Sequence, residues 1–116
     1  MLDLLAILTF PTAVHYKAVM DEKMIGFIAG DRRAREKVGW VTTVGVLPEF
    51  RKQGVATALM QVCETGLAMS KIRLCVRRTN LNAQNLYIQL GYHQIDVWKQ
   101  YYTGQEDALV FEKEIS

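Results

Sequence analysis

The segment RKQGVA (51–56) carries residues that could hold a phosphate group. It follows an apolar, β-branched run and precedes a run with helical spacing, so Gly54 should fall at the start of a helix. Backbone N–H groups in a first helical turn have no partner within the helix, and the helix dipole adds partial positive charge there. A pyrophosphate would fit that end, with Arg51 and Lys52 supplying full charges. A glycine at such a place is often only a turn residue, so this segment alone leaves both interpretations open.

The elements that must position this segment follow from changes in hydrophobic period. The runs 14–20 and 24–30 are strand-like and joined by a tight turn, whereas 32–37 is a charged connector. We expect a helix over 2–9, strands over 14–20, 24–30, 38–47, 72–78, 92–99 and 107–114, and further helices over 53–69 and 83–90. This order predicts a mixed α/β sheet with a central strand–helix–strand crossover.

Composition limits the classes of protein that need to be considered. The 116 residues are 50% hydrophobic with a formal net charge of +2, which predicts a single domain over residues 1–116 and gives no argument for nucleic acid or membrane as partner. No apolar run approaches the length of a membrane span, and the opening stretch does not read as a signal peptide. Cys63 and Cys75 lack metal-type spacing and suit a reducing cytoplasm. With only His15 and His93, no metal site is expected.

The motifs of the second half occur in an order that is known from one family. RKQGVA, the strand IRLCVRRTN and the stretch NLNAQNLYIQLGY together resemble the GNAT acetyltransferase family, over roughly residues 14–116. The closing YYTGQEDALVFEKEI resembles the branch that includes bacterial ribosomal-protein alanine acetyltransferases and eukaryotic N-terminal acetyltransferase subunits. The resemblance implies a GNAT-like mixed central sheet flanked by helices. It also implies acetyl transfer from acetyl-CoA to an amine by direct attack in a ternary complex.

The same resemblance assigns residues to the coenzyme. Backbone groups of Val44, Gly45 and Val46 would align the pantetheine arm like an added strand. The pyrophosphate would lie on backbone amides of Arg51, Lys52, Gln53, Gly54, Val55 and Ala56, with Thr57 just beyond. Asn80 would contact the coenzyme near its pantetheine or thioester end, although an asparagine there could equally cap the following helix.

Three tyrosines are candidates for catalysis and acceptor binding by the same resemblance. The phenol of Tyr87 could act as general acid toward the leaving thiolate, or its ring could simply pack between Leu86 and Leu90. Tyr101 and Tyr102, expected in the loop between the last two strands, would contact the acceptor peptide. Alternatively they cover the sheet edge.

Cys75 departs from the branch, which often carries a Glu or His as base at this position. A neutral thiol is a poor base; Arg73 and Arg77 on its strand face could lower its pKa, but a packed cysteine is the preferred interpretation. An α-amine has a pKa near 8 and a lysine amine near 10.4, so freeing them at pH 7 costs about 1 and about 4–5 kcal/mol. A site without a strong base therefore favours a protein N-terminal α-amine. A small amine, a lysine, or an acyl-CoA-binding module without catalysis are the alternatives.

The resemblance also predicts what the beginning of the chain lacks. GNAT domains open with a strand and a helix before the segment that begins here. An absent first strand would leave the run 14–20 as an unpaired edge, which a homodimer could cover.

Overall fold

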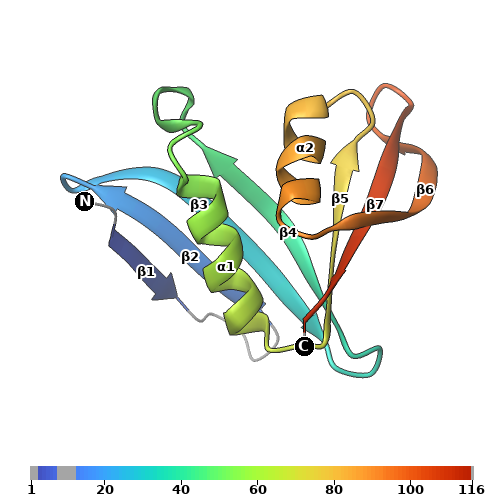
Figure 1. Cartoon of the computed structure of the whole chain (residues 1–116), viewed down its shortest axis with the longest axis horizontal. Coiled ribbons are helices and arrows are strands. Elements are labelled where there is room, and N and C mark those ends of the chain that lie inside the picture. The colour runs from blue at the N-terminus through green and yellow to red at the C-terminus, as the bar shows by residue number, and fades with distance from the viewer. Residues whose placement is uncertain (1–2, 8–12, 116) are drawn as a thin grey trace.

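The computed structural model describes residues 3–7 and 13–115, which form a seven-stranded sheet in the order β1-β2-β3-β4-β5-β7-β6 (Figure 1). The strands are β1 (Asp3–Ile7), β2 (Ala13–Met20), β3 (Lys23–Arg33), β4 (Val38–Val46), β5 (Lys71–Arg77), β6 (His93–Tyr102) and β7 (Glu106–Glu114). The helices are α1 (Val55–Leu67), α2 (Leu81–Gln89) and a 3-10 turn, η1 (Pro48–Phe50). The predicted mixed α/β sheet is confirmed: β4 and β5 are parallel and α1 connects them, while the other neighbours pair antiparallel.

The predicted helix over 2–9 is wrong for residues 3–7, and its remaining residues lie outside the described part of the chain. Residues Asp3–Ile7 form strand β1, which pairs antiparallel with β2 over 3–7 and 15–19. The edge of β2 that was expected to be unpaired is therefore paired, which removes the reason for expecting a homodimer there. A short apolar run cannot be assigned from period alone, and here pairing with a neighbouring strand determines its conformation.

Both helices pack on the same face of the sheet (Figure 1). Helix α1 buries one side at four-residue spacing, with Val55, Leu59, Cys63 and Leu67 in the core. The alternating residues Ile72, Leu74 and Val76 of β5 point into that core. Since side chains alternate along a strand, Arg73, Cys75 and Arg77 face the other side of the sheet, as the sequence predicted.

Candidate functional site

Strands β4 and β5 begin side by side and then diverge. Their parallel pairing covers only residues 38–41 and 71–74, ending at Val41 and Leu74. Figure 1 shows the two arrows spreading apart beyond this point. The register between β3 and β4 shifts at the same place, because Ala29 pairs with Thr43 and Gly30 with Val41. Thr42 is thus an extra residue, and such a bulge bends its strand.

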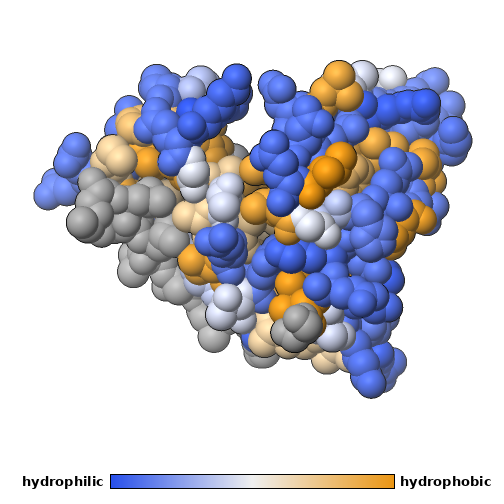
Figure 2. Space-filling model, viewed as in Figure 1, coloured by the Kyte–Doolittle hydropathy of each residue, from blue (hydrophilic) through white to orange (hydrophobic). Residues whose placement is uncertain are grey.

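The diverging part of β4 carries the three residues predicted to hold pantetheine. Val44 and Val46 are half-buried and Gly45 is exposed. A Cβ built on Gly45 has no neighbouring atom within 4 Å, so the backbone faces open space there. The space-filling view is hollowed between the part of the surface above α1 and the part above α2, with apolar and near-neutral residues at its floor (Figure 2). An extended ligand could therefore approach this strand edge in the manner of an added strand.

The start of helix α1 lies next to the end of β4. Gly54 is the N-cap in the left-handed region, at φ 83°, and no side chain caps the helix. No atom lies within 4 Å of a Cβ built on this glycine. The first-turn amides of Val55, Ala56 and Thr57 have no partner within the helix, as in any first helical turn. The structure thus brings the predicted phosphate-binding segment to an open helix N-terminus.

The side chains of this turn hold it in place. Arg51 donates from Nε to the carbonyl oxygen of Val46 at 3.1 Å. Gln53 donates from Nε2 to the carbonyl oxygen of Glu49, also at 3.1 Å. Arg51 therefore links the end of β4 to the turn, so the two predicted coenzyme segments are fixed relative to each other.

At the start of α2, the Oδ1 atom of Asn80 accepts a hydrogen bond from the backbone N–H of Ala83 at 3.2 Å. The capping role that the sequence left open is therefore present. The side chain is exposed, so capping does not exclude a ligand contact.

Tyr87 is buried on α2, with its ring edge-on to Tyr92 and Phe111 at centroid distances of 6.0 and 6.4 Å. Burial, and secondarily the nearby phenol of Tyr102, raise the pKa of Tyr87 to about 12. Its hydroxyl makes no hydrogen bond to a described residue. The described part of the protein has no fully buried side-chain oxygen or nitrogen without a partner, so this hydroxyl must reach accessible surface. The ring therefore packs as one interpretation expected, while the role of the hydroxyl as general acid stays a prediction.

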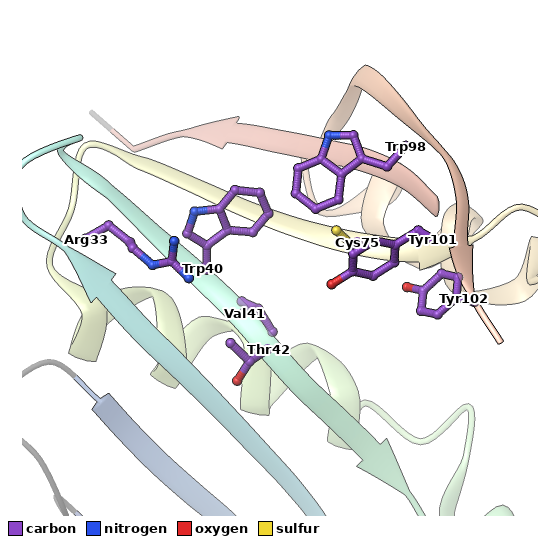
Figure 3. A pocket seen from close by; sticks show the side chains of 8 residues that line it. All are labelled: Arg33, Trp40, Val41, Thr42, Cys75, Trp98, Tyr101 and Tyr102. Atoms are coloured by element: carbon purple, nitrogen blue, oxygen red, sulfur yellow. The ribbon is translucent and has the colours of Figure 1, made fainter. Parts of the chain in front are cut away.

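A pocket of about 260 Å³ lies on the sheet face opposite the helices, where β4 and β5 begin to diverge (Figure 3). It is lined by Arg33, Trp40, Val41, Thr42, Cys75, Trp98, Tyr101 and Tyr102. The predicted Cys75, Tyr101 and Tyr102 therefore come together. The tyrosines differ from expectation in one respect: they belong to the end of β6 rather than to a loop, which covers only 103–105.

The thiol of Cys75 is not activated by its neighbours. Arg73 pairs with Glu112 at 2.7 Å, and Arg77 pairs with Glu106 at 3.0 Å. Burial raises the pKa of the Cys75 thiol, contrary to the alternative in which the arginines lower it. These facts favour the packed cysteine.

The carboxylates of Glu106 and Asp107 hold the segments around the pocket. The carboxylate of Glu106 accepts hydrogen bonds from the backbone N–H and hydroxyl of Thr79 and from Arg77. That of Asp107 accepts from the backbone N–H of Gln100 and from an arginine side chain. The pKa of both carboxyls is lowered, mainly by these hydrogen bonds.

Sequence reasoning missed the other lining residues, notably Arg33, Trp40 and Trp98. The alternation along β4 could have placed Trp40 on the face of Thr42, but Trp98 meets it only through the order of the strands. Among the described residues, no group of three or more His, Cys, Asp or Glu could hold a metal ion. None of the described helices is long and apolar enough to cross a membrane.

Comparison with known proteins gives one family. The model of the acetyltransferase (GNAT) family matches residues 3–92. N-alpha-acetyltransferase 20 of Dictyostelium discoideum is 33% identical over 111 residues, covering 90% of this chain; the chain spans only 64% of that relative's length. This relative falls in the N-terminal acetyltransferase branch that the motifs resemble.

Solved structures agree in fold. The ribosomal-protein-S18-alanine N-acetyltransferase of Escherichia coli superposes with a TM-score of 0.82 at 24% identity, covering 93% of this chain and 72% of its own. Arabidopsis thaliana Naa50, solved with the bisubstrate analogue CoA-Ac-MVNAL, gives 0.79 at 24% identity, covering 87% and 72%. The motifs, the diverging strands and the family match lead to the same conclusion: the chain belongs to the acetyltransferase (GNAT) family.

Proposed function

We propose that this protein transfers the acetyl group of acetyl-CoA to the α-amine of a protein N-terminus, by direct attack in a ternary complex. The observation that carries the proposal is the divergence of β4 and β5. Beyond Val41 the edge of β4 is no longer paired with β5, and this part of the strand leads from the pocket at Val41 and Thr42 toward the turn before α1, which supports placing acetyl-CoA along it.

The residues present fit acetyl-CoA. The amides of residues 51–56, with Thr57, would bind the pyrophosphate, since the turn is open and Arg51 and Lys52 add positive charge. The edge of β4 at 44–46 would hold the pantetheine arm, and Asn80 would contact it near the thioester. When bound, acetyl-CoA would supply the activated acetyl group, whose C–S bond breaks as the acceptor nitrogen forms the new C–N bond.

The pocket beside Cys75 would hold the acceptor. Tyr101 and Tyr102 offer phenols to the peptide backbone, and Tyr102 lies near enough to Tyr87 to affect its pKa. The lining residues include no carboxylate and no imidazole that could act as base. An amine that is already partly neutral at pH 7 therefore suits the pocket, and an α-amine is such a group. Its proton would leave through water, while the Tyr87 hydroxyl would stabilise the departing thiolate.

We also propose that the protein acts in a reducing cytoplasm. Cys63 and Cys75 are both free thiols, as expected in a reducing cytoplasm. The near-balanced charge gives no argument for nucleic acid or a membrane surface as partner, and we propose an amine-bearing peptide as the partner besides acetyl-CoA.

The test is acetyl-CoA turnover on paired peptides. One peptide has a free α-amine and no lysine, and the other has an acetylated N-terminus and one lysine. We expect turnover with the first peptide and at least tenfold less with the second, because lysine is the costlier amine to deprotonate. Faster reaction with the lysine peptide, or with a polyamine, would contradict the proposed acceptor. Tight CoA binding without turnover on any amine would instead identify a binding module that has lost catalysis.

A further inference from the structure

Four aromatic residues of the pocket form a continuous row, here called the aromatic wall: Trp40, Trp98, Tyr101 and Tyr102. Ring centroids of successive members are 5.7 Å apart for Trp40 and Trp98, 5.3 Å for Trp98 and Tyr101, and 5.1 Å for Tyr101 and Tyr102. The wall is not sealed by the rest of the chain, since Tyr101 is 56% exposed and both tryptophans are only half-buried. Large rings left facing a pocket are the usual means of binding an apolar group.

One end of the pocket lies close to the position proposed for the thioester, and the other end lies farther from it. Thr42 and Cys75 each lie one residue beyond the last paired position of β4 and β5, so their end opens toward the gap proposed for the thioester. Trp40 lies before that position, where the strands are still paired. Figure 3 shows Cys75, Tyr101 and Tyr102 grouped at one end, with Trp98 above them and Trp40 and Arg33 farther along. An α-amine at the gap would therefore place its own side chain along the wall.

The charges around the wall select against a charged side chain. The guanidinium of Arg77 already lies over the ring of Tyr102 at 4.2 Å, and Arg33 lines the other end. A further cation would therefore find the face of the Tyr102 ring already occupied by a guanidinium group. Both guanidinium groups are already paired with carboxylates, Arg77 with Glu106 and Arg33 with Asp31, which weakens their pull on an acidic side chain.

We propose that the aromatic wall receives the side chain of the acceptor's first residue and selects a large uncharged one, such as methionine or leucine. The inference rests on the proposed function and adds to it the class of N-terminus. Methionine and leucine bury several more apolar groups than alanine, and the methionine sulfur contacts aromatic rings favourably. Trp40 and Trp98 thereby become specificity-determining residues.

The kinetic test uses peptides that differ only at residue 1, which is Met, Leu, Ala or Arg. We expect kcat/KM for Met and Leu to exceed that for Ala and Arg by about 10- to 100-fold. Trp98→Ala, which removes the ring that touches both Trp40 and Tyr101, should reduce this preference to within about threefold. Ile95→Ala is the matched control, because it removes an exposed apolar side chain of the same strand that does not line the pocket.

Binding provides a readout that does not depend on turnover. The chain has two tryptophans, and both belong to the wall, so tryptophan fluorescence reports on its occupancy. A saturable change with the Leu peptide at lower concentration than with the Ala or Arg peptide is expected, in the presence of CoA. If the peptides are acetylated at equal rates, or Arg is fastest, the inference fails and N-terminal acetylation stands. If only small amines are acetylated, the proposed function fails, and the fluorescence titration alone decides the inference. In that case, the absence of a selective fluorescence change would overturn the inference.

Discussion

Replacing Tyr87 with phenylalanine tests how the leaving thiolate is stabilised. The ring would keep its contacts with Tyr92 and Phe111 and lose only the hydroxyl. The pKa of Tyr87 is raised to about 12, whereas an ordinary thiol has a pKa of about 8.5. Complete transfer of the phenol proton to a thiolate would therefore be uphill by about 5 kcal/mol, at 1.36 kcal/mol per pKa unit. We expect Tyr87 to donate a hydrogen bond to the sulfur rather than to give up its proton.

The magnitude follows from this distinction. A hydrogen bond to a charged group contributes about 1.5–3 kcal/mol, so Tyr87→Phe should lower kcat by about 10- to 150-fold. The affinity for acetyl-CoA, measured by calorimetry, and the thermal unfolding midpoint should change little, because the ring remains packed.

The pH profile separates the same alternatives. Tyr87 stays protonated well above its ordinary pKa, so wild-type kcat should show no descending limb up to about pH 10. Unchanged kcat in Tyr87→Phe would return the residue to a purely packing role. A loss beyond about 10³-fold would show that a full proton transfer had been removed, and would refute the energetic reasoning.

Three further variants test other parts of the site and fold. Gly54→Glu should weaken CoA binding by about tenfold or more, since it adds bulk and negative charge at a φ of 83° that side chains rarely adopt; unchanged calorimetric affinity would remove the phosphate assignment. Cys75→Ala should leave the rise of kcat/KM to a plateau near pH 8 unaltered, because that rise belongs to the α-amine; a large loss would make the thiol a working group. Gly66→Ala should lower the free energy of unfolding by about 1–3 kcal/mol in urea titrations, despite the better helix propensity of alanine, because its Cβ would lie 1.8 Å from the Tyr16 hydroxyl; a stabilised variant would contradict this packing.

The sequence predicted those elements whose patterns are local. The alternation of Ile72, Leu74 and Val76 was sufficient to place Cys75 on the correct face, and the glycine turn before α1 was found from the change of period. The tight turn between β2 and β3 was also found, although Asp21 and Glu22 adopt positive φ without a glycine.

The errors and omissions concern contacts between distant segments. Strand β1 takes its conformation from pairing with β2, which its own apolar residues do not encode. Trp40 and Trp98 lie on strands that β5 and β7 separate in the sheet, and no local pattern indicates that their rings meet. The ion pairs that occupy Arg73 and Arg77 are likewise tertiary, so the effect of these arginines on Cys75 could not be predicted.

The short ladder between β4 and β5 has a mechanical consequence. Within the described sheet, β1 to β4 form one antiparallel ribbon and β5, β7 and β6 form another, and these two ribbons share backbone hydrogen bonds only over residues 38–41 and 71–74. Helix α1 crosses from the end of one ribbon to the start of the other. We therefore expect local separation of β4 from β5 to require less free energy than unfolding of either ribbon. A ligand in the gap, with its amides bonded to the free edge of β4, would add contacts where the pairing of β4 and β5 ends. Cofactor binding and the association of the two ribbons would then be linked equilibria.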